Sequence, residues 1–252
     1  MKCYLCHQNV ATLEKSHIIP ECLYEDIYDD KHRFIPIASD NYRQLKIEQL
    51  GYREELLCKS CEGKLSKWEN TTKKDLVDIS QRKNKFLTIN ELSDKFIIIE
   101  NINHDNFKKC MLSILWRMSI SKLEMFNAYS LGPYEEAIRK ILNENSALST
   151  YDFPLMIQEL IINGKHHPDL IMSFPKGRVF NKYIQQSFTV YGYLIDIIIS
   201  KHKFPQNYEL LLLTDTGRMT LMKMKFSNQH LKHGLLSRLN DEDVRRFYKN
   251  VT

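Results

Sequence analysis

Apolar residues recur at helical spacing in the first part and in the middle of the chain. Leu65, Trp68 and Ile79 fall on one face of an expected helix. The segment 105–126 has the same spacing, which predicts a second, buried helix. A further helix is expected around Pro133, because proline is favoured in a first helical turn.

After residue 150 the pattern becomes strand-like. Three stretches are rich in Ile, Leu, Tyr and Phe, at 155–163, 185–200 and 208–226. Asp215-Thr216-Gly217 is typical of a hairpin turn, and a short strand is expected at 96–99. The pattern therefore predicts an α+β fold with a helical middle and a largely antiparallel C-terminal sheet.

These elements divide the chain into two expected parts. Residues 1–82 would form a small cysteine-bearing module, and residues 83–252 an α+β domain. The module would contain a short helix at 21–30, after Pro20, and a polar insertion at 31–49. The domain would have helices at about 105–146, a sheet at about 151–228 and a terminal helix at about 240–250.

The charge is unevenly distributed. The 252 residues carry a net charge of +5, and the last third, 165–252, holds 14 Lys and Arg against 7 Asp and Glu. This surplus favours attraction to a phosphate backbone, or it is an ordinary solvated sheet face. The N-terminus has no apolar signal segment, and the apolar run 191–200 is shorter than the roughly 20 residues that span a bilayer. A cytoplasmic protein without a membrane partner is expected.

Four of the six cysteines form two C-x-x-C pairs, Cys3 with Cys6 and Cys58 with Cys61. Each pair supplies two thiolates from one tight turn, and two such turns complete a tetrahedral zinc site. The long gap between the pairs is no obstacle, because the entropy of loop closure grows only slowly with length. We therefore predict one structural Zn²⁺, with lone Cys110 as a small core residue.

The sequence between the cysteine pairs contains Ser-His-Ile-Ile-Pro at 16–20, and Leu-Leu-Cys-x-x-Cys at 56–61 leads into the expected helix. This joint pattern resembles the HNH family of ββα-metal endonucleases in its zinc-stapled form, over residues 3–70. It is also similar to a poorly characterised group of HNH-like bacterial proteins, some associated with phage defence. The resemblance implies a treble-clef-like ββα module.

The resemblance also implies a catalytic site. His17 takes the position of the general base, and Glu62, directly after the last cysteine, takes that of a ligand to catalytic Mg²⁺ or Mn²⁺. The chain departs from the family at three positions. Ser16 stands where an acid or histidine precedes the base, Glu54 and Glu55 stand where an asparagine orients it, and Glu62 replaces histidine or asparagine.

Three functions stay open at this point. The first is a metal-dependent endonuclease acting on nucleic acid, with DNA favoured over RNA. The second is a catalytically silent zinc module in a bacterial defence or toxin–antitoxin complex, whose C-terminal sheet binds a protein partner. The third is a sequence-reading DNA-binding protein, although no recognition helix rich in Arg and Asn is visible.

The histidines have structural interpretations as well. His17 can instead donate to a backbone carbonyl and pack under its neighbouring isoleucines. His166 and His167 are expected in a loop rather than in a site. His7 is expected to face solvent. His230 and His233 have the spacing of a ligand pair, but no cysteine or carboxylate partner is close in sequence.

Overall fold

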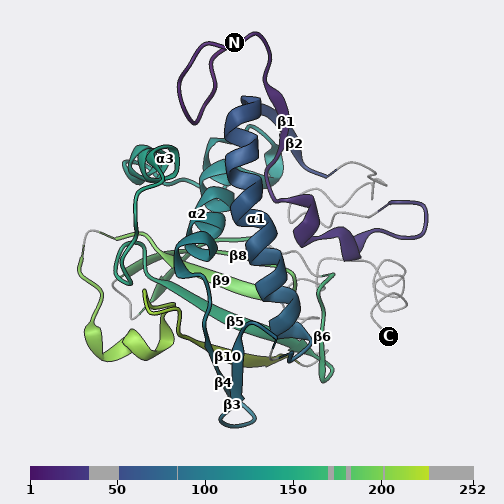
Figure 1. Ribbon diagram of the computed structural model, residues 1–252, viewed down its shortest axis with the longest axis vertical. Helices are drawn as coiled ribbons and strands as arrows, with labels where there is room; N and C mark the ends of the chain where they lie inside the picture. The colour runs from purple at the N-terminus through teal and green to yellow at the C-terminus, as the bar shows by residue number, and fades with distance from the viewer. Residues whose placement is uncertain (34–50, 84, 170–172, 180–182, 201, 227–252) are drawn as a thin grey trace.

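The computed structural model describes residues 1–33, 51–83, 85–169, 173–179, 183–200 and 202–226. In chain order its main elements are β1 (Glu14–His17), β2 (Arg53–Leu57), α1 (Lys59–Ser80), β3 (Thr88–Glu91), β4 (Phe96–Glu100), α2 (His104–Ile120), α3 (Tyr134–Glu144), β5 (Leu155–Ile162), β6 (Lys165–His166), β7 (Ser173–Val179), β8 (Tyr183–Val190), β9 (Tyr193–Ile198) and β10 (Met219–Phe226). Figure 1 shows α1 and α2 lying across one face of the larger sheet.

The N-terminal part is a two-stranded antiparallel sheet followed directly by a long helix. In the register of β1 and β2, His17 lies opposite Arg53. Cys58 is the single residue between β2 and α1. The amide of Glu62 donates to the Cys58 carbonyl at 3.0 Å. The order strand, strand, helix is therefore present, and it places the end of β1 beside the first turns of α1.

The larger sheet has eight strands in the order β3-β4-β10-β5-β9-β8-β7, with β6 paired to β5. All of its pairs are antiparallel except β10 with β5, so the prediction of a largely antiparallel sheet is confirmed. Strands β3 and β4 precede the helical middle, yet they join this sheet because β10 lies between β4 and β5. The sheet was expected to begin at about residue 151, so the prediction did not include β3 and β4.

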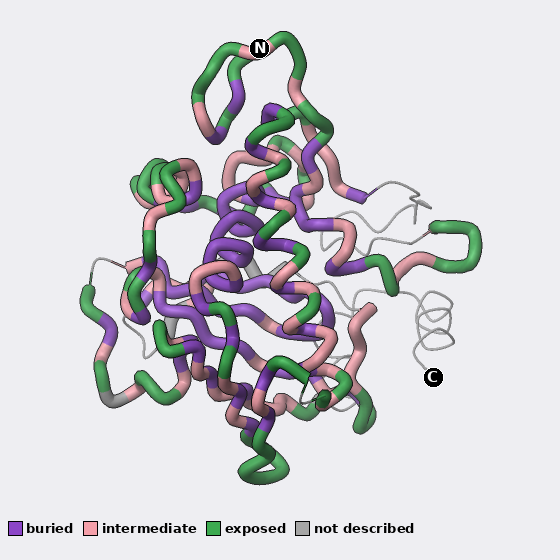
Figure 2. Tube along the Cα trace, in the orientation of Figure 1, coloured by how far each residue is buried: buried purple, intermediate pink, exposed green. Residues whose placement is uncertain are grey.

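The strands bury both faces, which explains their continuous apolar composition. In β5, Leu155 and Ile157 contribute to the core beneath the helices, whereas Met156 packs into a second cluster on the other face, with Phe204 and Leu212. Figure 2 shows the buried residues concentrated where α1 and α2 meet the sheet. One continuous core thus runs from the cysteine module to the strands.

The three helices of the described residues lie where they were expected, but α2 ends at Ile120, before the end of the expected segment 105–126, and Glu124–Phe126 is a separate 3₁₀ turn. Leu65, Trp68 and Ile79 of α1 are buried, as their spacing predicts. Helix α3 starts directly after Pro133, and its last carbonyls are capped by Asn145 in a left-handed conformation (φ 55°). Within the described residues, no helix is long and apolar enough to cross a membrane.

Two local predictions were wrong. The expected helix at 21–30 is two short 3₁₀ turns, Glu21–Leu23 and Glu25–Ile27, because hydrogen bonds close only over three residues there. The turn around Gly217 exists, but Gln206–Leu211 before it is a 3₁₀ segment, so no hairpin forms. The terminal helix at 240–250, His230 and His233, and most of the insertion at 31–49 lie outside the described residues.

Candidate metal centre and histidine cavity

The four paired cysteines converge at one point. Their Sγ atoms all lie within 4.8 Å of one another. The Sγ atoms of Cys6 and Cys58 are 3.9 Å apart, far beyond the roughly 2.05 Å of a disulfide. Tetrahedral ligation with zinc–sulfur bonds of about 2.3 Å requires sulfur atoms about 3.8 Å apart, which matches this separation. The four thiols therefore fit a metal ion such as zinc.

The thiols differ in electrostatic environment. Burial raises the pKa of Cys61, which its thiol neighbours raise further. Burial also raises the pKa of Cys3, but hydrogen bonds from backbone amides to its sulfur have the larger combined effect and lower this pKa to about 7. One of these amides is that of Cys58, 3.3 Å from the Cys3 sulfur. A thiol of this kind deprotonates readily, as a metal ligand must.

A cavity of about 230 Å³ lies beside the cysteine cluster. His17, at the end of β1, and Glu62, in the first turn of α1, both line it. The remaining lining residues are Pro20, Glu21, Cys22, Ser66, Glu69, Asn70 and Arg117. The structure therefore brings together the two residues to which the sequence assigned catalytic chemistry.

One face of α1 supplies the polar floor of this cavity. Ser66 follows Glu62 by four residues, and Glu69 and Asn70 follow Ser66 by three and four, which places all of them on one side of the helix. The Oε1 atom of Glu62 is buried and has no hydrogen-bond partner among the described residues. A buried carboxylate oxygen without a partner is costly, so this atom is suited to bind a cation.

His17 is held as a neutral imidazole. Its side chain is 23% exposed, but Nε2 is buried and lies 3.5 Å from Glu21 Oε2. Burial is the largest cause that lowers the pKa of His17 to about 4; the Arg53 guanidinium adds to this effect and Glu21 opposes it. At pH 7 the ring is therefore uncharged and carries a lone pair on one nitrogen.

Arg117 of α2 completes the cavity and was missed in the sequence. It is 1% exposed, and it donates from Nη1 to the His17 carbonyl and from Nη2 to Glu69 Oε1, both at 2.7 Å. Its Nε also donates to the Ser113 carbonyl. The available signal was a single arginine in the mostly apolar stretch 110–118, because a buried guanidinium requires a partner.

The structure shows what occupies two of the positions that depart from the HNH pattern, Ser16 and Glu54. Ser16 is buried, and its hydroxyl donates to the Glu14 carbonyl at 3.4 Å, so it does not line the cavity. Glu54 accepts hydrogen bonds from Ser121 Oγ and the amide of Lys122, which turns it towards the end of α2. Neither side chain is available to bind metal or orient His17.

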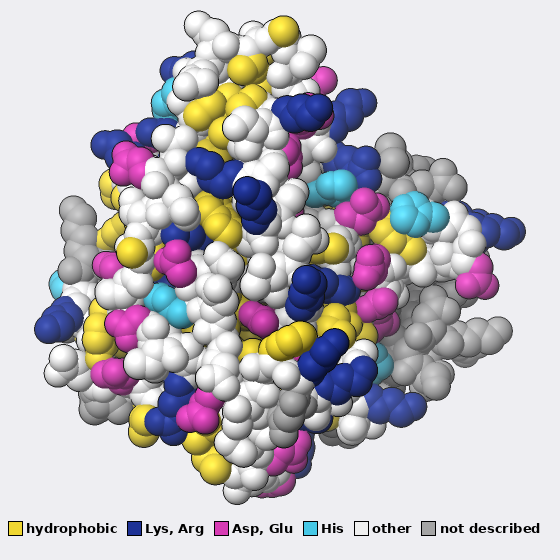
Figure 3. Space-filling view, viewed as in Figure 1, with side chains coloured by type: hydrophobic (Ala, Val, Ile, Leu, Met, Phe, Trp, Pro, Cys, Tyr) yellow, Lys and Arg dark blue, Asp and Glu magenta, His cyan; other side chains and the backbone are white. Residues whose placement is uncertain are grey.

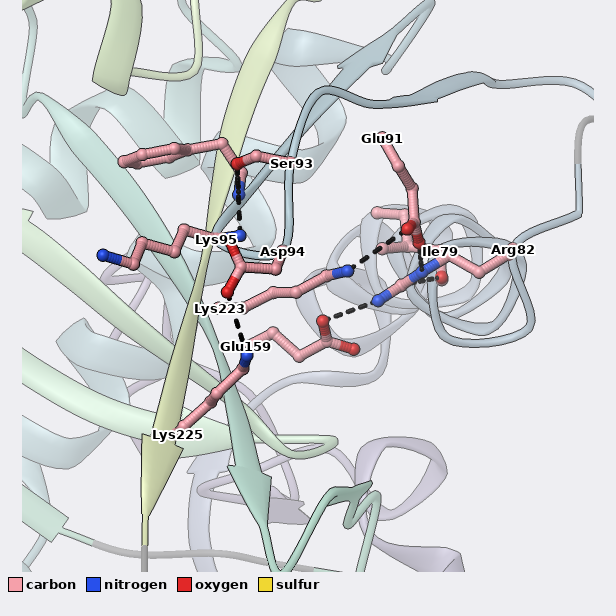
Figure 4. A network of polar contacts seen from close by, with 10 residues as sticks. Ile79, Arg82, Glu91, Ser93, Asp94, Lys95, Glu159, Lys223 and Lys225 are labelled. Carbon is pink, nitrogen blue, oxygen red and sulfur yellow. Dashed lines mark hydrogen bonds and ion pairs between the residues drawn. The ribbon is translucent and has the colours of Figure 1, made fainter.

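Of the other described histidines, His32 lies 3.6 Å from Glu21, which lines the cavity, whereas His7 and His166 do not line it. His166 forms part of β6, packs against Tyr193 with ring centroids 4.7 Å apart, and lies 3.5 Å from Glu159. Glu159 is itself paired with Arg82 at 2.6 Å, within the polar network that Figure 4 shows. His7 is exposed next to the cysteine cluster.

The rest of the surface offers less to this chemistry. A second cavity, of about 260 Å³, lies between α3 and the end of β9 and contains none of the predicted site residues. Figure 3 shows basic and acidic side chains interspersed among the described residues of the viewed face. Comparisons with protein-family models, curated proteins and solved structures found no match.

Proposed function

We propose that this protein is an HNH-like, metal-dependent endonuclease that hydrolyses phosphodiester bonds in nucleic acid, with DNA as the favoured substrate. The single observation that carries the proposal is that His17 and Glu62, from β1 and α1, line one cavity. The proposal includes a treble-clef-like module stapled by Zn²⁺ on Cys3, Cys6, Cys58 and Cys61.

Three residues of the cavity, His17, Glu62 and Arg117, have roles in this proposal. His17, neutral at pH 7, removes a proton from the attacking water. Glu62 would hold Mg²⁺ or Mn²⁺ through the buried Oε1 atom that has no other partner among the described residues. Such a cation supplies charge stabilisation to the phosphate oxygens when bound. Arg117 keeps the end of β1 and Glu69 in place from α2.

The test is plasmid nicking by the zinc-loaded protein with Mg²⁺ and then Mn²⁺. Loss of the base should lower the rate by about 10²–10⁴-fold in His17→Ala, and Glu62→Gln should lose metal-dependent activity. The matched control is Glu55→Gln, because Glu55 is an exposed carboxylate on β2. Zinc content must be equal in all variants. Nicking that survives His17→Ala would overturn the proposal.

A second candidate is a catalytically silent zinc module that binds a protein partner. The observation in its favour is that, in the described part of the chain, only the cysteines form a compact group of metal-ligating side chains. Glu62, Glu69 and His17 line one cavity without such close convergence. Calorimetric titration of the zinc-loaded protein with Mn²⁺ separates the two. The endonuclease should bind Mn²⁺ and lose this binding in Glu62→Gln, whereas the silent module should give the same result with and without this substitution.

A further inference from the structure

The carboxylate of Glu21 lies at the centre of a polar cluster on one side of the cavity. Its Oε2 atom is 3.5 Å from His17 Nε2, and Arg53 Nη2 lies 3.4 Å from both of its oxygens. Tyr28 donates its hydroxyl to Oε1 at 3.4 Å, and His32 Nε2 lies 3.6 Å from the same oxygen. Four side chains therefore surround this one carboxylate, and two of them, Arg53 and Tyr28, donate hydrogen bonds to it.

The local sequence explains why Glu21 faces His17. Pro20 precedes the 3₁₀ turn Glu21–Leu23, which directs the chain back across the end of β1. Arg53, opposite His17 in the β1–β2 register, holds the carboxylate from the neighbouring strand. The contact therefore depends on elements far apart in the chain.

The chemistry of these groups selects one form of the histidine. A neutral imidazole carries one N–H and one lone pair, and an ionised carboxylate only accepts hydrogen bonds. Nε2 is buried, makes no hydrogen bond among the described residues and lies 3.5 Å from Glu21 Oε2. A proton on Nε2 would face this carboxylate, which favours the Nε2–H form. The lone pair then resides on Nδ1, and the exposed part of the side chain belongs to atoms other than Nε2.

We propose that Glu21 is the positioning residue of His17: it holds the proton on Nε2 and leaves Nδ1 to accept the proton from water. This inference rests on the proposed nuclease function. Glu21 thus takes the orienting role that the family resemblance assigns to the position of Glu54 and Glu55. Arg117 fixes the His17 backbone from the opposite side, so ring and backbone are both restrained.

The experiment is long-range proton–nitrogen NMR of the zinc-loaded full-length protein, labelled with ¹⁵N at histidine. The His17 signals are assigned by their absence in His17→Ala. Wild type should show the Nε2–H tautomer, and Glu21→Ala should show a mixture. Glu21→Gln should keep the Nε2–H tautomer, because its amide oxygen still accepts. Glu55→Ala is the matched control, since this exposed carboxylate is not among the residues that line the cavity.

Nicking assays accompany the spectra. Glu21→Ala should lower kcat by about 10–100-fold with little change in KM, as is typical when a partner that orients a catalytic histidine is lost. Zinc content and the thermal midpoint of each variant identify any failure to fold, and Glu21→Gln then carries the test. A tautomer that is unchanged in Glu21→Ala, or an Nδ1–H tautomer in wild type, would overturn the positioning role.

The spectra separate this inference from the nuclease itself, because the tautomer is read without turnover. If wild type is inactive but Glu21→Ala shifts the tautomer, the endonuclease proposal fails while the Glu21–His17 assignment is supported. If wild type is active and the His17 tautomer is the same in Glu21→Ala, the endonuclease proposal is supported and the positioning role fails.

Discussion

Arg117 in α2 donates from Nη1 to the carbonyl oxygen of His17 at 2.7 Å and so joins the end of β1 to the helical middle of the chain. The same guanidinium pairs with Glu69 of α1 at 2.7 Å. Contacts of this kind cross the boundary expected near residue 82, and the cavity draws on both sides of it. The division into two domains stays a prediction, but the candidate site belongs to the whole fold.

Loss of Arg117 should strongly destabilise the protein. Arg117→Met removes one partner of a buried ion pair and leaves the Glu69 carboxylate uncompensated, which typically costs about 3–5 kcal/mol. Urea denaturation measures the loss as a lower unfolding midpoint. Arg33→Met is the control, because the Arg33–Asp29 pair is exposed and its loss should leave the midpoint unchanged. The double variant Arg117→Met/Glu69→Met should recover part of the stability; equal midpoints for Arg117→Met and Arg33→Met would contradict the prediction.

Removing the metal should unfold the cysteine module first. Cys58→Ser, or a strong chelator, eliminates ligation at the point where β2 meets α1. Bound zinc should disappear, and hydrogen exchange should accelerate in β1 and β2 more than in the larger sheet. Cys22→Ala is the control, since Cys22 lies outside the cluster and should leave zinc content unchanged. Full exchange protection of β1 in the metal-free protein would refute a structural role.

Stability should fall on mild acidification, partly through His166. Burial is the main cause that lowers the pKa of His166 to about 4, and the Arg82 guanidinium contributes. Between about pH 6.5 and pH 4 the unfolded chain therefore binds more protons than the folded one, so stability is highest above this window and declines through it. Glu159 lies 3.5 Å from His166 Nδ1 and is paired with Arg82, so the carboxylate and the guanidinium act on the imidazole in opposite directions.

Urea titrations at pH 7, 6, 5 and 4.5 test this prediction. His166→Asn should flatten the decline, by up to about 3 kcal/mol across the window. His17 has a similarly lowered pKa, so a residual slope should remain. Exposed His202 provides the control, as His202→Asn should leave the slope unchanged. An undiminished slope in His166→Asn would exclude His166 as the source.

Replacement by alanine should lower the stability of the protein at Gly217 and raise it at Gly63. Gly217 has φ +77°, and an added Cβ would lie 2.4 Å from the Ile102 carbonyl oxygen, so Gly217→Ala should cost about 1–3 kcal/mol or more. Gly63 lies in α1 with open space around its Cα, so Gly63→Ala should stabilise the helix by about 0.5–1 kcal/mol. Thermal unfolding midpoints measure both. A neutral Gly217→Ala would indicate a different turn.

Much of the local structure was predictable. The helical spacing of Leu65, Trp68 and Ile79 indicated α1, and the C-x-x-C spacing indicated the cysteine cluster. The 3₁₀ turns at 21–27 were not, because a short segment lets proline and tertiary contacts outweigh helix propensity. Of the residues that line the cavity, the sequence analysis had named His17 and Glu62 as candidate catalytic residues and had not named Glu21, Glu69 or Arg117. The catalytic roles of His17 and Glu62 stay predictions.

The sequence by itself determined the features that depend on neighbours a few residues away: helix faces, apolar strands and paired thiols. The tertiary structure alone decided that β10 lies between β4 and β5, that Arg117 reaches β1, and that Glu21 faces His17. These relationships join residues through packing and buried charge. Many distant partners are compatible with one local pattern, and only burial in a common core selects among them.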